Sequence, residues 1–154
     1  MGFLTSIVSG GQTGVDRAAL DAGLRSGLIV GGWCPKGRLA EDGEIDITYP
    51  LRETPNDSYS VRTEWNVRDS DGTLILHQGK IFGGTAFTKR MALEYERPFF
   101  CVRLYEEVKL TEAICWAQSR EIRTLNIAGP RESGAPGIYN QAYQFLIQLF
   151  PKLR

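Results

Sequence analysis

The residues with the clearest chemical potential form a glycine-rich turn near the N-terminus. The segment Ser9-Gly10-Gly11-Gln12-Thr13-Gly14 follows an apolar run and precedes a helical pattern that begins at Val15. A strand that turns through glycines into a helix directs free backbone N–H groups and the positive end of the helix dipole at one point, which suits a phosphate or another small anion. The Thr13 hydroxyl can donate to the same oxyanion. We favour anion binding over a glycine turn that only makes a tight connection, and the spacing matches neither the dinucleotide nor the nucleoside-triphosphatase pattern.

Two later loops carry residues of the same kind. Gly83, Gly84 and Thr85 open a second helical pattern, and Thr85 can cap it. The last predicted strand leads into a loop in which Arg131 offers a planar guanidinium and Ser133 a hydroxyl. In a parallel sheet the strand-to-helix loops lie at one edge, so we expect all three segments to converge on a phosphorylated small molecule.

A polar stretch between these loops has two interpretations of equal weight. Arg62, Glu64 and Asn66 either face the pocket, near sugar hydroxyls or ring nitrogens of a ligand, or belong to a solvated helix face. Cys34 and Lys36 are possible pocket residues at a strand end, although packing is the favoured role of Cys34. The only histidine, His77, is interpreted as structural.

The long segment 35–58 breaks the alternation of strands and helices. It carries acids, glycine and prolines, and it starts where the second strand ends. Connections of this length are commonly functional. We favour a pocket wall or lid, with an oligomer contact as a nearly equal alternative.

The remaining pattern predicts an α/β fold, a three-layer α/β/α sandwich with a Rossmann-like, doubly wound and mainly parallel sheet of about five or more strands. The expected strands are Leu4–Ser9, Ile29–Trp33, Gly72–His77, Phe99–Leu104 and Thr124–Ala128. The expected helices are Val15–Ser26, Ser60–Asp69, Thr85–Glu96, Thr111–Arg120 and Gly137–Phe150. Pro151 is expected to mark the end of the last helix.

Composition narrows the function classes. The 154 residues fit one domain spanning 1–154, and the 18 basic and 18 acidic residues cancel, which argues against a nucleic-acid partner. The sequence shows no membrane-spanning stretch and no signal segment, so we expect no membrane partner and a cytoplasmic location. Three separated cysteines and a single histidine predict no disulfide and no dedicated metal site, with Cys101 and Cys115 as small core residues.

Several of these segments together resemble the putative molybdenum carrier family. The resemblance is carried by the first glycine turn and by four further runs: Gly32-Trp33-Cys34-Pro35-Lys36-Gly37-Arg38, Arg62-Thr63-Glu64-Trp65-Asn66-Val67, Gly83-Gly84-Thr85 and Gly129-Pro130-Arg131-Glu132-Ser133. That family is similar to a circularly permuted branch of the Rossmann-like superfamily that holds the lysine-decarboxylase-like phosphoribohydrolases and the DNA-processing protein. It implies a doubly wound sheet, a homo-oligomer (dimer or tetramer) and a pocket for a phosphorylated pterin- or nucleotide-like ligand, with molybdenum cofactor (molybdopterin) as possible cargo.

One departure from the relatives bears on catalysis. The phosphoribohydrolases carry a Pro-Gly-Gly-x-Gly-Thr-x-x-Glu turn, whereas the segment Phe82–Thr88 has no second Gly-Thr and no matching glutamate. Non-catalytic binding is therefore the leading hypothesis. The alternatives are a nucleotide N-glycosidic hydrolase, with Glu64 or Asp16 as its carboxylate, and a nucleotide-sensing module.

Overall fold

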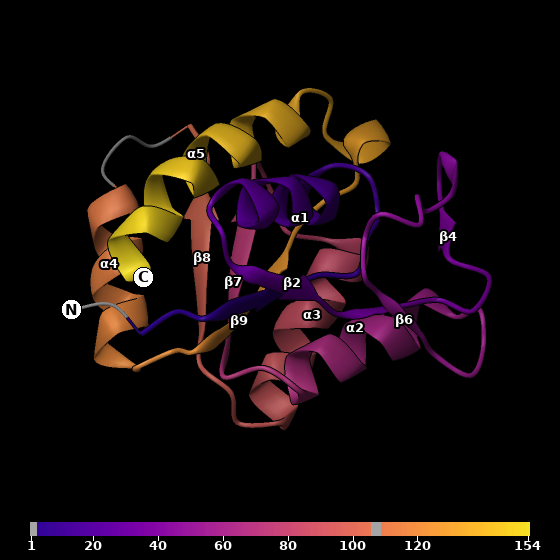
Figure 1. The fold of residues 1–154 in the computed structure, drawn as a ribbon, viewed down its shortest axis with the longest axis horizontal. Coiled ribbons are helices and arrows are strands. Elements are labelled where there is room, and N and C mark those ends of the chain that lie inside the picture. Colours follow the sequence, from indigo (N-terminus) through magenta and orange to yellow (C-terminus); the bar gives the residue numbers. More distant parts are fainter. Residues whose placement is uncertain (1–2, 106–108) are drawn as a thin grey trace.

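A parallel five-stranded sheet forms the centre of the computed structural model, which describes residues 3–105 and 109–154 (Figure 1). The strand order is β2-β1-β9-β7-β8, and every neighbouring pair is parallel. Its strands are β1 (Ser6–Val8), β2 (Ile29–Gly31), β7 (Gly72–His77), β8 (Phe99–Arg103) and β9 (Thr124–Ala128). All five predicted strands are present, and two of them have the predicted bounds.

Five α-helices cover the two faces of the sheet. They are α1 (Val15–Arg25), α2 (Tyr59–Arg68), α3 (Gly83–Glu94), α4 (Lys109–Ser119) and α5 (Ile138–Leu153). Helices α1, α4 and α5 lie on one face, and α2 and α3 on the other (Figure 1). This confirms the predicted three-layer, doubly wound architecture. The larger core cluster joins α1, α4 and α5 to the sheet. A smaller cluster, centred on Val67 and Met91, lies under α2 and α3.

Strand β7, which lies between β9 and β8, shows why the apolar runs predicted this fold. Leu74, Ile75 and Leu76 are all buried, because helices cover both faces of the sheet. A strand covered on both faces carries a continuous apolar run rather than an alternating one.

The predicted end of the last helix was wrong. Helix α5 continues through Pro151 to Leu153, whose side chain is buried in the core. Proline removes one hydrogen bond from the last turn, and the burial of Leu153 offsets that loss.

The long segment 35–58 and the two residues before it contain local structure that the sequence did not predict. Short strands β3 (Trp33–Cys34) and β6 (Arg52–Glu53) pair in parallel, and β4 (Leu39–Ala40) and β5 (Gly43–Glu44) form an antiparallel hairpin. The buried guanidinium of Arg38 organises the segment by donating to the carbonyl oxygens of Ile45, Asp46, Tyr49 and Leu51 at 2.8–3.3 Å. A guanidinium has five N–H donors, so it can bind several backbone carbonyl groups of an irregular segment at once.

The cysteines divide between core and surface. Cys34 is fully buried in the main core, as favoured, whereas Cys101 is half-buried. The prediction for Cys115 was wrong, because its position on α4 faces solvent. Within the described ranges, no group of three or more acidic, histidine or cysteine side chains is placed to hold a metal ion. A search of the same residues found no helix with the length and apolar character needed to cross a bilayer.

Candidate functional site

A cavity of about 480 Å³ opens at the carboxyl ends of β1, β9 and β7. Helix α1 connects β1 to β2 on one side, and α3 connects β7 to β8 on the other, so the chain changes direction across this crevice. Open α/β sheets bind ligands at such a switch point. The lining residues are Gly10, Gln12, Asp16, Tyr59, Ser60, Arg62, Thr63, Asn66, His77, Lys80, Ile81, Phe82, Gly83, Gly84, Thr85, Phe87, Thr88, Asn126, Ile127, Ala128, Gly129, Pro130, Arg131 and Gly134.

The charges of this lining favour an anionic ligand. Arg62, Lys80 and Arg131 contribute three cations, and Asp16 is the single carboxylate among the described residues that line the cavity. A cationic surface inside a concave, partly apolar site raises the local concentration of anions.

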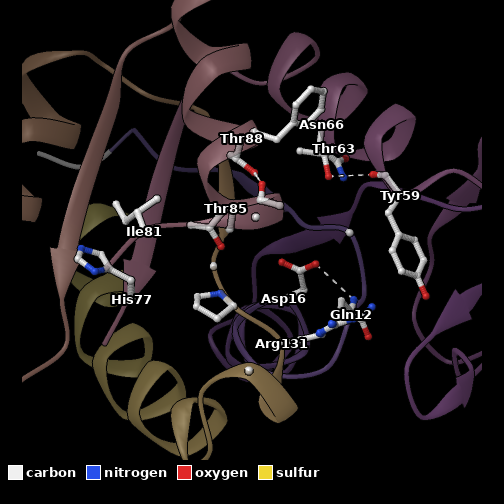
Figure 2. A pocket seen from close by; sticks show the side chains of 18 of the residues that line it. Gln12, Asp16, Tyr59, Thr63, Asn66, His77, Ile81, Thr85, Thr88 and Arg131 are labelled. Atoms are coloured by element: carbon white, nitrogen blue, oxygen red, sulfur yellow. Dashed lines mark hydrogen bonds between the residues drawn. The ribbon is translucent and has the colours of Figure 1, made fainter. Parts of the chain in front are cut away.

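The N-terminus of α3 presents the more accessible of the two glycine turns. Gly83 and Gly84 line the cavity, are exposed, and have open space where a side chain would stand. Thr85 lies beside them with its side chain toward the cavity (Figure 2). The first amides of a helix lack intrahelical acceptors, and the first turn of α3 contains no acidic side chain. This turn can therefore accept a phosphate without electrostatic repulsion.

The first glycine turn contributes only part of its residues to the cavity. Gly10 and Gln12 line it, whereas Gly11, Thr13 and Gly14 lie outside the lining. A Cβ on Gly11 would stand 2.6 Å from the Leu51 side chain, and one on Gly14 would stand 2.5 Å from the carbonyl oxygen of Pro130. Close packing of the turn against other loops thus requires these two glycines, and their predicted contact with a ligand stays a prediction.

Asp16 places a carboxylate on the cavity wall between Thr85 and Tyr59 (Figure 2). Its Oδ2 accepts from the Gln12 amide at 3.3 Å and lies 3.9 Å from Nη1 of Arg62. Burial raises the pKa of Asp16 to about 6, and Arg62 and the Gln12 amide oppose that rise. The carboxylate is therefore suited to accept hydrogen bonds from ligand hydroxyl or N–H groups, or to exchange a proton near neutral pH.

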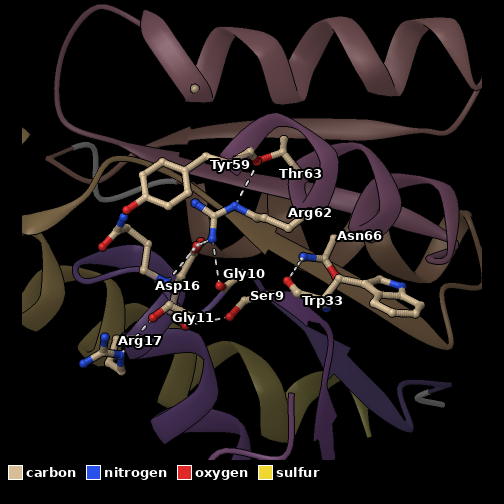
Figure 3. A network of polar contacts seen from close by, with 12 residues as sticks. Ser9, Gly10, Gly11, Asp16, Arg17, Trp33, Tyr59, Arg62, Thr63 and Asn66 are labelled. Carbon is tan, nitrogen blue, oxygen red and sulfur yellow. Dashed lines mark hydrogen bonds and ion pairs between the residues drawn. The ribbon is translucent and has the colours of Figure 1, made fainter. Parts of the chain in front are cut away.

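Arg62 is held in place by contacts within the protein. Its Nη1 donates to the Gly10 carbonyl at 2.8 Å, its Nε donates to the Thr63 hydroxyl at 3.2 Å, and the guanidinium lies 5.0 Å from the ring centroid of Tyr59 (Figure 3). It therefore fixes the position of the glycine turn and supplies positive charge beside Asp16.

The other predicted residues of α2 have different environments. Asn66 lines the cavity, but its side-chain amide bonds the backbone of Trp33 in both directions, at 2.8 and 3.0 Å (Figure 3). Glu64 lies outside the lining and accepts from the Tyr95 hydroxyl at 2.5 Å. Cys34 is buried in the core and Lys36 is exposed, and neither lines the cavity.

The last loop brings Arg131 to the cavity and Ser133 to its border. Ser133 lies outside the lining, where its amide donates at 3.1 Å to the Glu41 carboxylate and its hydroxyl donates to the same group. Thr13 also donates to Glu41 through its hydroxyl. The segment 35–58 thus touches the residues around the site, although no residue of that fully described segment lines the cavity itself.

Sequence reasoning missed Tyr59, Lys80 and Asn126 as lining residues. Both Lys80 and Asn126 could have been found from their positions in the sequence. Lys80 lies between β7 and the second glycine turn, and Asn126 lies inside the last predicted strand. His77 also lines the cavity, and its Nδ1 donates to the Gly79 carbonyl at 2.7 Å.

Fold and site together define a Rossmann-like, doubly wound α/β protein with a partly apolar cavity, lined by three cations, at the switch point of its sheet. Residues 7–150 match the model of the circularly permutated YpsA SLOG family, and the chain belongs to that family. The crystal structure of a putative molybdenum carrier protein from Syntrophus aciditrophicus SB is similar at 45% identity and a TM-score of 0.90, over 97% of this chain and 96% of that one. A search of curated proteins found no match. The family resemblance seen in the sequence is confirmed.

Proposed function

We propose that this protein binds and carries, without transforming it, a small molecule that combines a phosphate group with a pterin- or nucleotide-like ring. The observation that carries the proposal is the cavity at the switch point, with three cations, one carboxylate and the open N-terminus of α3 in its wall. The phosphate would lie at Gly83, Gly84 and Thr85, with Lys80 close in sequence to neutralise it.

The rest of the ligand would extend toward Asp16 and Tyr59. The Asp16 carboxylate can accept from hydroxyl or ring N–H groups, and the Tyr59 side chain offers an aromatic surface in the same wall. Arg131, more than half exposed, would close the site from the side of the last loop.

The cargo that we propose is molybdenum cofactor. The name of the Syntrophus neighbour supports it. The pterin dithiolene of the cofactor brings its own sulfur ligands, so a carrier needs only to hold the organic part and the phosphate.

Calorimetric titration of the full chain with nucleoside monophosphates and a pterin phosphate tests the binding proposal. Lys80→Ala is expected to weaken binding by about tenfold, the effect of one charge-assisted hydrogen bond. Lys89→Ala, an exposed lysine of α3 outside the lining, is the matched control. Equal affinity of Lys80→Ala and wild type, or no binding of any of these compounds, would contradict the proposal.

The cargo is tested separately by purification from cells that synthesise molybdenum cofactor. Native mass spectrometry and denaturing extraction are expected to identify a pterin phosphate. A co-purified nucleotide in its place would favour the sensing alternative.

One observation favours a second candidate function, nucleotide N-glycosidic hydrolysis. Asp16 is a carboxylate inside the cavity whose pKa, raised by burial to about 6, suits proton exchange. Release of a free base from a nucleoside monophosphate by wild type, but not by Asp16→Asn, would establish this activity and overturn non-catalytic binding.

A further inference from the structure

The hairpin Leu39–Glu44, which we name the strap, is fastened to the border of the cavity by one carboxylate. Glu41 accepts hydrogen bonds from the Thr13 hydroxyl, the Ser133 amide at 3.1 Å and the Ser133 hydroxyl. The Nε of Arg131 lies 3.7 Å from the same carboxylate. Three donors and a guanidinium therefore surround one anionic group.

These donors are oriented by contacts that do not involve the Glu41 side chain. The Thr13 hydroxyl oxygen accepts from the Glu132 amide at 3.1 Å, which leaves its proton to be donated outward. The Ser133 amide belongs to the short helical turn Glu132–Gly134, where Gly134 and Ala135 bond back to the Arg131 carbonyl. This set of donors thus comes from the first glycine turn and the last loop, two segments that are far apart in the sequence.

Such a set of donors suits a phosphate oxygen as well as it suits a carboxylate. Both present acceptor oxygens that carry negative charge, and both are bound by hydroxyls, backbone amides and arginine. The hydrogen bonds from Ser133 and Thr13 hold the pKa of the Glu41 carboxyl below its usual value, so the occupant is an anion at neutral pH.

The strap has few other attachments at its tip. Residues 41–44 are exposed, and the space around Gly43 is open. Asp42 accepts two hydrogen bonds of 3.1 Å from the Arg17 guanidinium, and the Asp42 side of this ion pair is half exposed. The Gln12 side chain accepts from the Glu41 amide at 2.8 Å. In contrast, Arg38 anchors the base of the strap with its buried carbonyl contacts, so the tip can lift while the base stays in place.

Two residues connect the strap to the cavity. Gln12 and Arg131 contact Glu41 and also line the cavity wall. An anion that binds in place of Glu41 would therefore lie beside the ligand of the proposed function.

We propose that Thr13, Ser133 and Arg131 form an oxyanion site that Glu41 occupies when the strap is closed, and that a phosphate group takes this site when the strap lifts. The proposal rests on the proposed function for the position of the cavity ligand. The phosphate is either free or part of that ligand, and in the second case it lies here rather than at Gly83, Gly84 and Thr85. The strap then regulates access by competition between its own carboxylate and the incoming phosphate.

The thermal midpoint of the full chain, measured in inorganic phosphate against sodium chloride of equal ionic strength, tests the site itself. Glu41→Ala removes the internal occupant and is expected to gain about 3 °C in roughly 10 mM phosphate beyond the gain of wild type, as for a site of about millimolar affinity. Glu44→Ala, which removes an exposed acid of the same hairpin, is expected to respond as wild type does. Adding Ser133→Ala to Glu41→Ala is expected to abolish the extra gain.

A response of Glu41→Ala no larger than that of wild type, or one that survives Ser133→Ala, would overturn the proposal. If Glu41→Ala does not fold, Glu41→Gln keeps the shape without the charge and is subject to the same comparison. A second measurement uses a nucleoside monophosphate and identifies the source of the phosphate. If the extra rise in thermal midpoint of Glu41→Ala is larger than with inorganic phosphate, the site binds the phosphate of the cavity ligand. If the two extra rises are equal, the site binds free phosphate. Because the first measurement does not use the cavity ligand, its outcome is independent of the Lys80→Ala titration.

Discussion

Ser133 donates to Glu41 from both its amide, at 3.1 Å, and its hydroxyl, although 92 residues separate them in the sequence. This contact joins the hairpin after β3 to the loop after β9, and Thr13 joins both to the first glycine turn. The segment 35–58, predicted to be a pocket wall or lid, with an oligomer contact as the alternative, is thereby fixed to the border of the cavity.

Glu41→Gln is expected to loosen the strap while leaving the fold intact. The variant keeps one acceptor oxygen but loses the charge that strengthens three hydrogen bonds, so we expect a loss of about 1 kcal/mol of unfolding free energy. Amide hydrogen exchange is expected to accelerate in residues 39–44 and to stay unchanged in β7. Glu44→Gln serves as the control, and equal exchange in the two variants would contradict the assigned contact.

The same contact predicts a pH dependence of definite sign. Hydrogen bonds from Ser133 and Thr13 lower the folded pKa of Glu41 below the unfolded value of 4.5, so its contribution is present above that value and is lost as the pH falls through the folded pKa. The difference in thermal midpoint between wild type and Glu41→Gln is therefore expected to be full at pH 7 and to shrink below pH 4.5. A difference that grows on acidification would be inconsistent with this arrangement.

Asp16→Asn is expected to stabilise the protein at neutral pH. Burial raises the pKa of Asp16 from 3.8 to about 6 against the opposing charges of Arg62 and Arg17, so the folded state retains a proton that the unfolded chain releases. The free energy of unfolding therefore falls as the pH rises between these two pKa values. Asparagine carries no charge at any pH, so the variant does not lose this stability. Urea unfolding is expected to show a gain of about 3 kcal/mol at pH 7 that is largely lost near pH 4. A loss of equal size at both pH values would show that the Asp16 contacts stabilise the fold instead.

The three cysteines are expected to react with a maleimide in the order of their exposure. Cys115 is exposed, Cys101 is half-buried, and Cys34 is fully buried. Burial raises the pKa of Cys34 and of Cys101, which lowers their thiolate fraction further. Mass spectrometry of the native protein is expected to show Cys115 labelled first and Cys34 labelled only on unfolding. Early labelling of Cys34 would mean that the segment 35–58 opens readily.

The sequence predicted the sheet and its helices because both depend on local patterns. The apolar run Thr73-Leu74-Ile75-Leu76 is typical of a strand covered on both faces. The topology of parallel strands then places Gly83 and Arg131 at one edge of the sheet. The roles of Arg38 and Glu41 could not be predicted, because their partners are set by tertiary structure. The same limit applies to Cys115, since one position along α4 decides between core and solvent.

Gly14 and Gly84 illustrate two different roles of glycine in a turn: close packing against the protein, and access for a ligand. Gly14 has φ +78° and would place a Cβ 2.5 Å from the Pro130 carbonyl oxygen, whereas Gly84 has open space around it and lines the cavity. Gly14→Ala is therefore expected to cost about 3 kcal/mol of unfolding free energy or to prevent folding, because both the backbone angle and the contact are unfavourable. Gly84→Ala is expected to leave the unfolding free energy within about 0.5 kcal/mol of wild type and, by crowding the N-terminus of α3, to weaken phosphate-ligand binding. Denaturant unfolding and calorimetry of both variants check this, and a stable Gly14→Ala would show that the first turn is not fixed by packing.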